Sequence, residues 1–506
     1  MVLGIDLGTS NSVAASLSRD GRPVLIPDAN NKEAKSTPSL VLLEGKKAYA
    51  GSFADTLFEL YPDKKLISFF KRSFGTADPV HVDEFGNPWF SESIAALILK
   101  KLRFDAELAL PDGFQQTVIT VPAHYNDIQR KSVIEAARLA GLPLTGILEE
   151  PVAAALFYGN VHSKIEDEII LVYDFGGGTF DLTMITRSGD HLHVIAKDGI
   201  SKLGGKEFDE IVSNNIKEKY QKAFGIPFPT DKLSANRLQK ISEKIKIELN
   251  EADSPLNLNK WMLFGYEAFE CSFRYGDYIS KAHPLILRTE AALNRCLRSL
   301  GMQFSNIHKM ILIGGTSSSK LVYNFWKNKI GKHQELIYHQ PLSSVAKGAA
   351  LYAASLSDNV GMTQMRPIEL RSVSTYNIGL AVLDRPDRKI DTLIYRNTPL
   401  PVSAKRIYEI DPARNNTLRF GLCQFWEESD VQQIGIVKAG PFEAGAPFFL
   451  EANIENRLNG TIGIKLFNAS TGKDIRFEFI REESHYKYDY NGQQALVDNV
   501  YLNNYI

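Results

Sequence analysis

Two glycine-rich turns, each carrying an aspartate, constrain the fold of this chain more than any other feature. Residues 4–11 read GIDLGTSN and follow an apolar run, and residues 174–181 read DFGGGTFD and follow another. An apolar run that ends in such a turn is typical of a strand entering a tight loop. Glycines allow backbone N–H groups to approach phosphate oxygens, and an aspartate can hold a hydrated Mg²⁺. The repetition predicts a duplicated domain whose two halves clamp the phosphates of a nucleotide.

Residues 1–357 alternate apolar segments of strand length with amphipathic segments of helix length. Residues 117–121 form an expected strand that Pro122 ends. Residues 127–140 have apolar residues at helical spacing, followed by Gly141, a residue type that favours helix C-termini. This alternation predicts an α/β domain whose sheets are covered by helices.

The sequence pattern changes after about residue 355. Residues 358–368 are polar with one glycine and one proline, which is typical of a linker. Residues 369–480 contain short strand-like segments separated by turn clusters, a pattern that predicts an antiparallel β-sandwich. Residues 481–506 are polar and too few to build a helical bundle, so we expect a short C-terminal tail without a helical lid.

Composition disfavours several function classes. The 506 residues carry a formal net charge of −1, which gives no electrostatic reason to expect nucleic acid or a membrane surface as a partner. The three cysteines are too few and too scattered for a disulfide framework or a cysteine-based zinc site, and no apolar run is long enough to span a membrane. A strand begins within two residues of Met1, so we expect no secretory signal and a cytoplasmic location, with delivery as a pathogen's effector left open.

Three further segments carry candidate nucleotide-binding residues. No GxxxxGK[ST] loop is present, so a phosphate-binding lysine must come from elsewhere, and Lys71 stands among apolar residues. Glu243, Lys246 and Asn250 have the i, i+3, i+7 spacing of one helix face, which can bind a ribose and an adenine. Residues 314–318 form a Gly-Gly turn that allows close approach of a flat base. Taken alone, Lys71 also fits an ordinary amphipathic lysine, and the helix face also fits a solvated charged stripe.

The order of these motifs resembles that of the 70-kDa heat-shock chaperones, the DnaK-like family, which have the actin/sugar-kinase fold. The resemblance covers residues 1 to about 355 and extends more loosely into the β region through residues 378–380 and 396–401. It implies an α/β, actin-like/sugar-kinase-like ATPase domain of duplicated lobes, followed by an all-β sandwich domain that binds peptides. The matching segments are residues 4–9, Lys71, residues 120–130, 150–155, 174–181, 203–209 and 243–249, and Gly314 with Gly315.

The resemblance implies ATP or ADP with Mg²⁺ as ligands, and slow Mg²⁺-dependent ATP hydrolysis. In this family pattern Lys71 stabilises charge on the transferred phosphoryl group, and Glu150 and Asp174 position the attacking water, as suits a reaction governed by positioning and electrostatics. The implied catalytic residues are Lys71, Glu150, Asp174 and Thr179, and the implied Mg²⁺ residues are Asp6, Asp174 and Asp181. The implied nucleotide-binding residues are Gly8, Thr9, Ser10, Asn11, Lys71, Gly176, Gly177, Gly178, Thr179, Gly204, Gly205, Glu243, Lys246, Asn250, Gly314, Gly315, Thr316 and Ser318.

The chain departs from the family pattern at several positions. Lys206 stands where an acidic residue usually follows the Leu-Gly-Gly turn, and Ser318 replaces an arginine that stacks on adenine, which lowers the expected adenine affinity. Gly146 stands where an arginine often contacts J-domain partners, and residues 340–343 read QPLS in place of an acidic motif. The apolar linker and the helical lid are missing, and the segment 71–122 is shorter than in the family.

The resulting interpretation is a chaperone-like ATPase that binds unfolded or extended peptide segments through backbone hydrogen bonds and one apolar pocket. Leu383, Tyr408 and Leu418 lie near the family's pocket positions, although they also fit plain sandwich core. A J-domain co-chaperone and a nucleotide exchange factor are further implied partners, and Pro122 and Arg130 match the family's relay between the domains. The alternative is a lidless regulatory or partner protein that binds ATP with little hydrolysis and no peptide cycling; a small-molecule kinase is disfavoured. Without a lid or an apolar linker, we expect weak coupling between the domains and fast peptide exchange.

Overall fold

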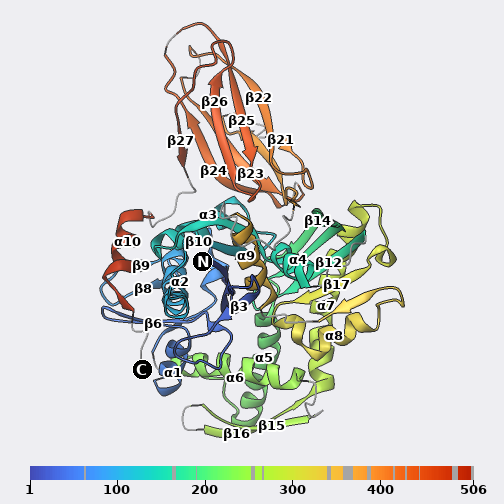
Figure 1. The fold of residues 1–506 in the computed structure, drawn as a ribbon. Coiled ribbons are helices and arrows are strands. Elements are labelled where there is room, and N and C mark those ends of the chain that lie inside the picture. Colours follow the sequence, from blue (N-terminus) through green and yellow to red (C-terminus); the bar gives the residue numbers. More distant parts are fainter. Residues whose placement is uncertain are drawn as a thin grey trace.

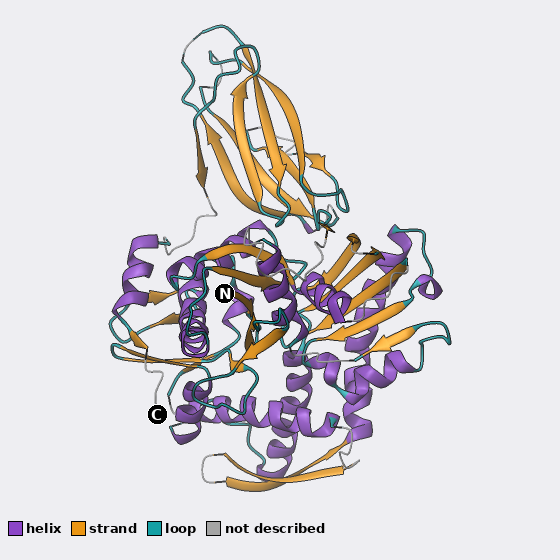
Figure 2. Ribbon diagram, in the orientation of Figure 1, coloured by secondary structure: helices purple, strands orange, loops and turns teal. Residues whose placement is uncertain are grey.

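The computed structural model describes residues 1–61, 64–161, 167–189, 191–251, 257–264, 267–338, 343–356, 369–384, 389–413, 416–427, 430–443, 445–480 and 488–502. Figures 1 and 2 show a larger part made of sheets and helices, here called the α/β part, and a smaller part made of strands, here called the β part. The predicted linker 358–368 and residues 340–342 of the QPLS segment lie outside the described residues. No helix among the described residues combines the length and the apolar character needed to cross a bilayer.

The first sheet of the α/β part is built from six strands of the N-terminal segment. These strands are β1 (Val2–Asp6), β2 (Asn11–Leu17), β3 (Pro23–Ile26), β4 (Thr37–Pro38), β10 (Gln116–Val121) and β11 (Leu144–Glu149). Five of them follow the order β11-β10-β1-β2-β3, and β4 pairs with β2 beside them. β1 is antiparallel to β2 and parallel to β10. The first glycine-rich turn therefore joins β1 to its antiparallel neighbour.

The second sheet repeats this arrangement. Its strands are β12 (Glu168–Phe175), β13 (Phe180–Ser188), β14 (His191–Ile200), β17 (Lys309–Ile313), β18 (Glu335–Ile337) and β19 (Glu369–Arg371). They follow the order β18-β17-β12-β13-β14-β19. β12 is antiparallel to β13 and parallel to β17, so the second glycine-rich turn joins β12 to β13 as the first joins β1 to β2.

Two helices rich in small residues, α4 (Glu150–Val161) and α9 (Ser344–Ser355), pack against each other between the two sheets (Figure 1). A Cβ on Gly4 would lie 2.2 Å from the backbone nitrogen of Ala350 in α9. A Cβ on Gly348 would lie 1.7 Å from the carbonyl oxygen of Ala153 in α4. Only glycine allows backbones to approach this closely, so these two positions set how near the two sheets can come.

The remaining elements of the α/β part lie around the two sheets, and a hairpin of residues 257–264 and 267–274 packs on helices rather than on either large sheet. Helix α3 (Asp127–Leu139) occupies the segment for which a helix was predicted, and it begins with a capping box in which the side chains of Asn126 and Gln129 each accept a backbone N–H. The other elements are α1 (Ser52–Leu60), α2 (Ser91–Ala109), α5 (Gly205–Phe224), α6 (Lys232–Asn250), α7 (Tyr275–Ser299), α8 (Lys320–Lys327), the 3₁₀ helix η1 (Phe70–Ser73), β5 (Val41–Glu44), β6 (Lys47–Ala50), β7 (Leu66–Ile67), β8 (His81–Val82), β9 (Pro88–Trp89), β15 (Asn257–Phe264) and β16 (Glu267–Arg274).

The β part consists of two antiparallel sheets that share one hydrophobic core. Its strands are β20 (Asn377–Val382), β21 (Ile390–Ile394), β22 (Val402–Ile410), β23 (Leu418–Phe425), β24 (Gln432–Ala439), β25 (Phe448–Asn456), β26 (Ile462–Asn468) and β27 (Phe477–Ile480). The order is β21-β20-β23-β24-β27 in one sheet and β22-β25-β26 in the other. Tyr408 and Leu418 are buried in the shared core, as expected if they are ordinary core residues of a sandwich. Leu383 is half-buried against a separate small apolar cluster.

Polar contacts join the β part to α3. The buried carboxylate of Asp127 accepts a hydrogen bond from the backbone N–H of Ile462 at 2.8 Å, and the backbone N–H of Asp127 donates to the side chain of Gln424 at 2.9 Å. Arg130, also buried, donates from Nη1 to the carbonyl oxygen of Asn459 at 2.9 Å. The two parts are therefore in direct contact, while the predicted linker lies outside the described residues. Buried polar groups of α3 form the docking contact.

A second set of contacts runs from β14 to the start of the β part. The ammonium of Lys197, buried in β14, donates to the hydroxyl of Ser372 and to the carbonyl oxygen of Val373, each at 2.8 Å. Arg396 in turn hydrogen-bonds the carbonyl oxygen of Lys197, and Tyr376 hydrogen-bonds that of His124. The chain entering the β part is thus held by a buried cation.

The C-terminal segment forms structure that the sequence did not predict. Residues Tyr490–Asn499 form helix α10, and Tyr501–Leu502 form strand β28, which pairs parallel to β6. Val497 is fully buried in the hydrophobic core beside the first sheet, and Lys100 of α2 donates to its carbonyl oxygen at 2.9 Å. Figure 1 shows α10 beside α2 and away from the strands of the β part. This helix therefore packs on the α/β part and does not cover the sandwich.

We expect Val497→Asp to release α10 from the α/β part. An unpaired carboxylate at this fully buried position costs several kcal/mol, which the helix avoids by detaching. Limited proteolysis should then cut within residues 488–502 faster than in the unmodified chain. The matched control is Ala495→Asp, because Ala495 is exposed on the same helix. Equal cleavage of the two variants would contradict the packing described here.

Candidate nucleotide site

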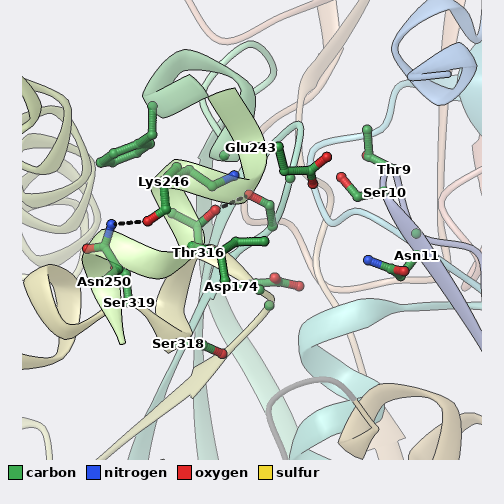
Figure 3. A pocket seen from close by; sticks show the side chains of 18 of the residues that line it. Thr9, Ser10, Asn11, Asp174, Glu243, Lys246, Asn250, Thr316, Ser318 and Ser319 are labelled. Carbon is green, nitrogen blue, oxygen red and sulfur yellow. Dashed lines mark hydrogen bonds between the residues drawn. The ribbon is translucent and has the colours of Figure 1, made fainter. Parts of the chain in front are cut away.

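A cleft of about 790 Å³ is lined by the ends of β1 and β12, the two glycine-rich turns and α6. This volume lies within the range typical of small-molecule sites. The sequence-predicted residues that line it are Asp6, Gly8, Thr9, Ser10, Asn11, Lys71, Glu150, Asp174, Gly176, Gly177, Thr179, Gly205, Glu243, Lys246, Asn250, Gly314, Gly315, Thr316 and Ser318. Figure 3 shows several of them converging on the cleft.

The first glycine-rich turn is tight, and the second lies so close to it that an added side chain would clash. A Cβ on Gly8 would lie 1.9 Å from the carbonyl oxygen of Asn11, and one on Gly177 would lie 2.2 Å from the hydroxyl of Ser10 on the opposite turn. Glycine at these positions leaves backbone N–H groups accessible from the cleft, which is the arrangement that holds phosphate oxygens.

Four carboxylates cluster at the floor of the cleft and behind it. Asp6, Glu150 and Asp174 line the cleft, and Asp181 lies opposite Asp174 in the β12–β13 pair. Burial, reinforced by the charge of Glu150, raises the pKa of Asp6 to about 7. Burial followed by the neighbouring carboxylates raises the pKa of Asp174 well above its usual range, and burial also raises the pKa of Glu150. Negative charge in this cluster therefore exceeds what the neighbouring cation compensates.

That cation is Lys71, which η1 brings to the cleft. Its ammonium lies 2.7 Å from Oε1 of Glu150, and the lysine side chain is only 3% exposed. The ring of Tyr125 lies 5.7 Å from the ammonium. The structure thus rules out the alternative of an ordinary amphipathic surface lysine. A buried lysine is held here because a carboxylate pairs with it.

The carboxylate cluster fits a hard divalent cation. Its donors are oxygens, which Mg²⁺ prefers, and the charge of Lys71 alone does not balance it. Oδ2 of Asp181 is buried and has no hydrogen-bond partner. Oδ1 of Asp181 accepts from the backbone and the ring of His124 at 2.9 and 2.8 Å. Asp6 and Asp174 face the cleft, while Asp181 lies behind its lining.

The other end of the cleft is built on α6. Glu243, Lys246 and Asn250 all line it, as expected for one helix face (Figure 3). The ammonium of Lys246 lies 2.8 Å from Oδ1 of Asp209, and Asn250 donates to the hydroxyl of Tyr278 at 3.1 Å. The face is therefore fixed by neighbours before any ligand binds, and it is not a freely solvated stripe.

Gly178 and Gly204 do not line the cleft, although the sequence placed them there. The N–H of Gly204 donates to Oε2 of Glu207 at 2.7 Å, and a Cβ on Gly204 would lie 2.5 Å from the nitrogen of Gly178. The two glycines therefore pack against each other behind the cleft, at the second glycine-rich turn. Their role in this structure is to let the start of α5 approach that turn.

A family comparison places these features in context. The family model described as Hsp70 protein matches residues 2–424 of the chain. This chain belongs to the Hsp70 family. The match includes the elements from β1 to α9 and ends within β23. It confirms the resemblance inferred from the ordered motifs, and it places the cleft in a family of ATP-binding chaperones with ATPase activity.

Arg72 is a site residue that sequence reasoning missed in this Hsp70-family chain. Its guanidinium forms two hydrogen bonds of 3.0 Å with the carboxylate of Glu207 at the start of α5, and it donates to the carbonyl oxygen of Gly178 at 2.8 Å. Arg72 comes from η1, on the side of the first sheet, so it connects the two halves beside the phosphate turns. The only sequence signal was its position next to Lys71.

Two tyrosines lie where the family's stacking arginine is absent. Tyr323 and Tyr338 line the cleft together with Ser318, and their ring centroids are 5.8 Å apart. The hydroxyl of Tyr338 donates to the carbonyl oxygen of Ser318 at 3.4 Å. Aromatic side chains are therefore available to contact a flat base at this end of the cleft, although the arginine is missing.

We expect Mg²⁺-dependent nucleotide binding to weaken as the pH falls from about 8 to about 6. The pKa of Asp6 is about 7 in the folded protein, so a bound cation must displace a proton below that pH but not above it. Each pH unit below the pKa costs up to roughly tenfold in cation affinity per displaced proton. Calorimetry with ATP at both pH values measures this change, and the same titration in EDTA is the control. A pH-independent affinity in Mg²⁺ would rule out the linkage to Asp6.

Proposed function

We propose that this chain binds ATP or ADP with Mg²⁺ in the cleft and hydrolyses ATP slowly. The observation that carries the proposal is the buried Lys71–Glu150 pair, which faces the two glycine-rich turns from the floor of the same cleft. A cation and a carboxylate at this place meet the requirements of phosphoryl transfer, where most of the acceleration comes from positioning and electrostatics.

Each group has a distinct role in this proposal. Backbone N–H groups of the turns at Gly8 and Gly177 hold the phosphate oxygens, with Thr9, Ser10 and Thr179 adding hydroxyls. Asp6 and Asp174 hold Mg²⁺, with Asp181 behind them, and the ion neutralises charge on the phosphates when bound. Lys71 stabilises charge on the phosphoryl group. Glu150, whose pKa burial raises, orients the attacking water and accepts its proton.

We further propose a division into an actin-like ATPase domain of duplicated lobes (1–357), a linker (358–368), a peptide-binding-like sandwich and a C-terminal segment (481–506). The start of the sandwich predicted from the sequence, residue 369, is too early, because β19 pairs with β14 of the α/β part and the strands of the sandwich begin with β20. The support for duplication is that five strands in each sheet of the α/β part share the same order and the same parallel or antiparallel sense. The support for the sandwich is the core shared by its two sheets.

The chaperone activity proposed here is the binding of unfolded or extended peptide segments by the β part. Family membership supports it, together with partners of the J-domain and nucleotide-exchange types. The burial of Tyr408 and Leu418 in the shared core favours a second candidate, a regulatory or partner protein that binds ATP with little hydrolysis and no peptide cycling. Binding of an extended peptide, measured by fluorescence anisotropy with ATP and with ADP, separates the two candidates.

Calorimetric titration of the full chain tests the nucleotide site itself. ATP and ADP should bind with one-to-one stoichiometry in Mg²⁺ and more weakly in EDTA. GTP should bind more weakly than ATP, because Lys246 and Asn250 are held by Asp209 and Tyr278 in one arrangement of hydrogen-bonding groups. Equal binding of GTP would remove the α6 face from base recognition, and no binding of either nucleotide would overturn the proposal.

A further inference from the structure

A group of metal-ligating side chains lies outside the nucleotide cleft, where β14 pairs with β19. His191, His193 and Glu369 each place one ligand atom within 4.8 Å of the ligand atoms of the other two. Nδ1 of His191 lies 3.0 Å from Oε2 of Glu369. The group contains no cysteine, and the two segments that meet here are far apart in the chain.

Strand geometry explains why these three side chains share one face. Alternate residues of a strand point to the same side, so His191 and His193 project together from β14 while Leu192 between them is buried. The parallel register places Glu369 beside His191 and Arg371 beside His193. The backbone pairing therefore presents the two imidazoles and the carboxylate on one surface.

The hydrogen bonds at this site leave ligand atoms available. Nε2 of His193 is buried and has no hydrogen-bond partner. Arg371 donates from Nε to Oε1 of Glu369 at 2.8 Å, which orients the carboxylate and leaves Oε2 directed at His191. A buried ring nitrogen without a partner is costly unless something binds it.

We propose that His191, His193 and Glu369 bind a zinc-type transition-metal ion. Imidazole nitrogen is a preferred ligand of Zn²⁺, Co²⁺, Ni²⁺ and Cu²⁺, and a carboxylate completes a three-ligand set of the kind zinc accepts with water in the remaining position. Mg²⁺ and Ca²⁺ prefer oxygen atoms for all of their ligands, so they are not suited to a site with two imidazole nitrogens. Two neutral imidazoles and one carboxylate carry one negative charge, which Arg371 already offsets, so we expect micromolar rather than tighter affinity.

The ion would fasten β19 to β14. β19 has three residues, and they are the first described residues after 357–368, between α9 and the β part. Directly after β19, Ser372 and Val373 accept hydrogen bonds from Lys197 of β14. A metal bridge at Glu369 therefore extends the contact that holds the entry of the β part on the α/β part. Because the ion binds only when the strands are paired, it stabilises the docked arrangement.

The test uses the full chain, freed of metal and kept in excess Mg²⁺ so that the carboxylates of the nucleotide cleft are occupied. Calorimetric titration with Zn²⁺ should give one site, and Co²⁺ should give a visible absorption band typical of nitrogen ligation. His193→Ala and Glu369→Gln should each weaken Zn²⁺ binding by more than about 100-fold, which exceeds the roughly 10–100-fold typical of losing an outer-shell partner. His333→Ala is the matched control because His333 is exposed and distant in the fold, and it should bind Zn²⁺ as the unmodified chain does.

Hydrogen exchange provides the second readout. Zn²⁺ should slow amide exchange in residues 369–371 of the unmodified chain and leave it unchanged in His193→Ala. Absence of stoichiometric Zn²⁺ binding, or binding that all three variants retain, would overturn the site. Stoichiometric binding without slower exchange in β19 would overturn its role in fastening the strands.

Discussion

The Lys71→Ala variant is expected to hydrolyse ATP roughly 10²–10³-fold more slowly than the unmodified chain, the scale for removal of one preorganised electrostatic partner. The ammonium of Lys71 is buried, pairs with Glu150 at 2.7 Å and faces the phosphate turns. Its removal takes away the positive charge nearest the phosphoryl group and raises the pKa of Glu150 further, because the ion pair no longer favours the carboxylate. Single-turnover hydrolysis measured with saturating ATP isolates this effect from binding.

Two comparisons make the Lys71 result specific. Lys244→Ala removes an exposed side chain of α6 that pairs with Glu59, and this variant should hydrolyse ATP at the unmodified rate. ATP affinity of Lys71→Ala, measured by calorimetry, should stay within a few-fold of the unmodified value because the glycine turns and α6 are intact. Unchanged turnover in Lys71→Ala would remove this residue from the mechanism.

The Arg130→Ala variant is expected to lose roughly 3 kcal/mol of stability and to loosen the β part from α3. Arg130 is buried, donates to Glu149 at 2.9 Å and reaches the carbonyl oxygen of Asn459 in the β part at 2.9 Å. Removing one partner of a buried ion pair typically costs about 3–5 kcal/mol, and the lower value applies because Lys197 still pairs with Glu149. Urea denaturation measures the stability, and small-angle scattering measures the loosening as a larger radius of gyration.

The control for Arg130 lies on the same helix. Arg138→Ala removes a half-exposed guanidinium that pairs with Glu135 and does not contact the β part in the described residues. It should change stability by less than about 1 kcal/mol. If Arg130→Ala and Arg138→Ala have the same radius of gyration as the unmodified chain, the α3 contacts do not hold the two parts together.

The phosphate end of the site was predictable because its chemistry is local. Gly8 and Gly177 stand in turns directly after apolar runs, and a turn built from glycine exposes backbone N–H groups wherever it occurs. The shared helix face of Glu243, Lys246 and Asn250 was likewise predictable, because their i, i+3, i+7 spacing places them on one side of a helix. The role of Lys71 needed the family resemblance, since an apolar flank is common around ordinary lysines.

Other features could not be read from the sequence because they join elements that are distant in the chain. The Arg72–Glu207 pair and the contact of Asp127 with Ile462 depend on how the two halves and the two parts pack. The meeting of His193 with Glu369 depends on which strand lies beside β14. Helix α10 was not predicted because its segment is mostly polar. Val497 is its only fully buried apolar side chain among the described residues, and one such residue gives no helical periodicity.

ATP turnover by the full chain, measured in Mg²⁺ and in EDTA with and without an unfolded peptide, tests the central claim most directly. The account predicts slow hydrolysis that requires Mg²⁺ and is faster with peptide bound, because Arg130 of α3 joins the carbonyl oxygen of Asn459 in the β part to Glu149, the residue before Glu150 of the cleft. A rate in Mg²⁺ no higher than that of Lys71→Ala, with or without peptide, would contradict it.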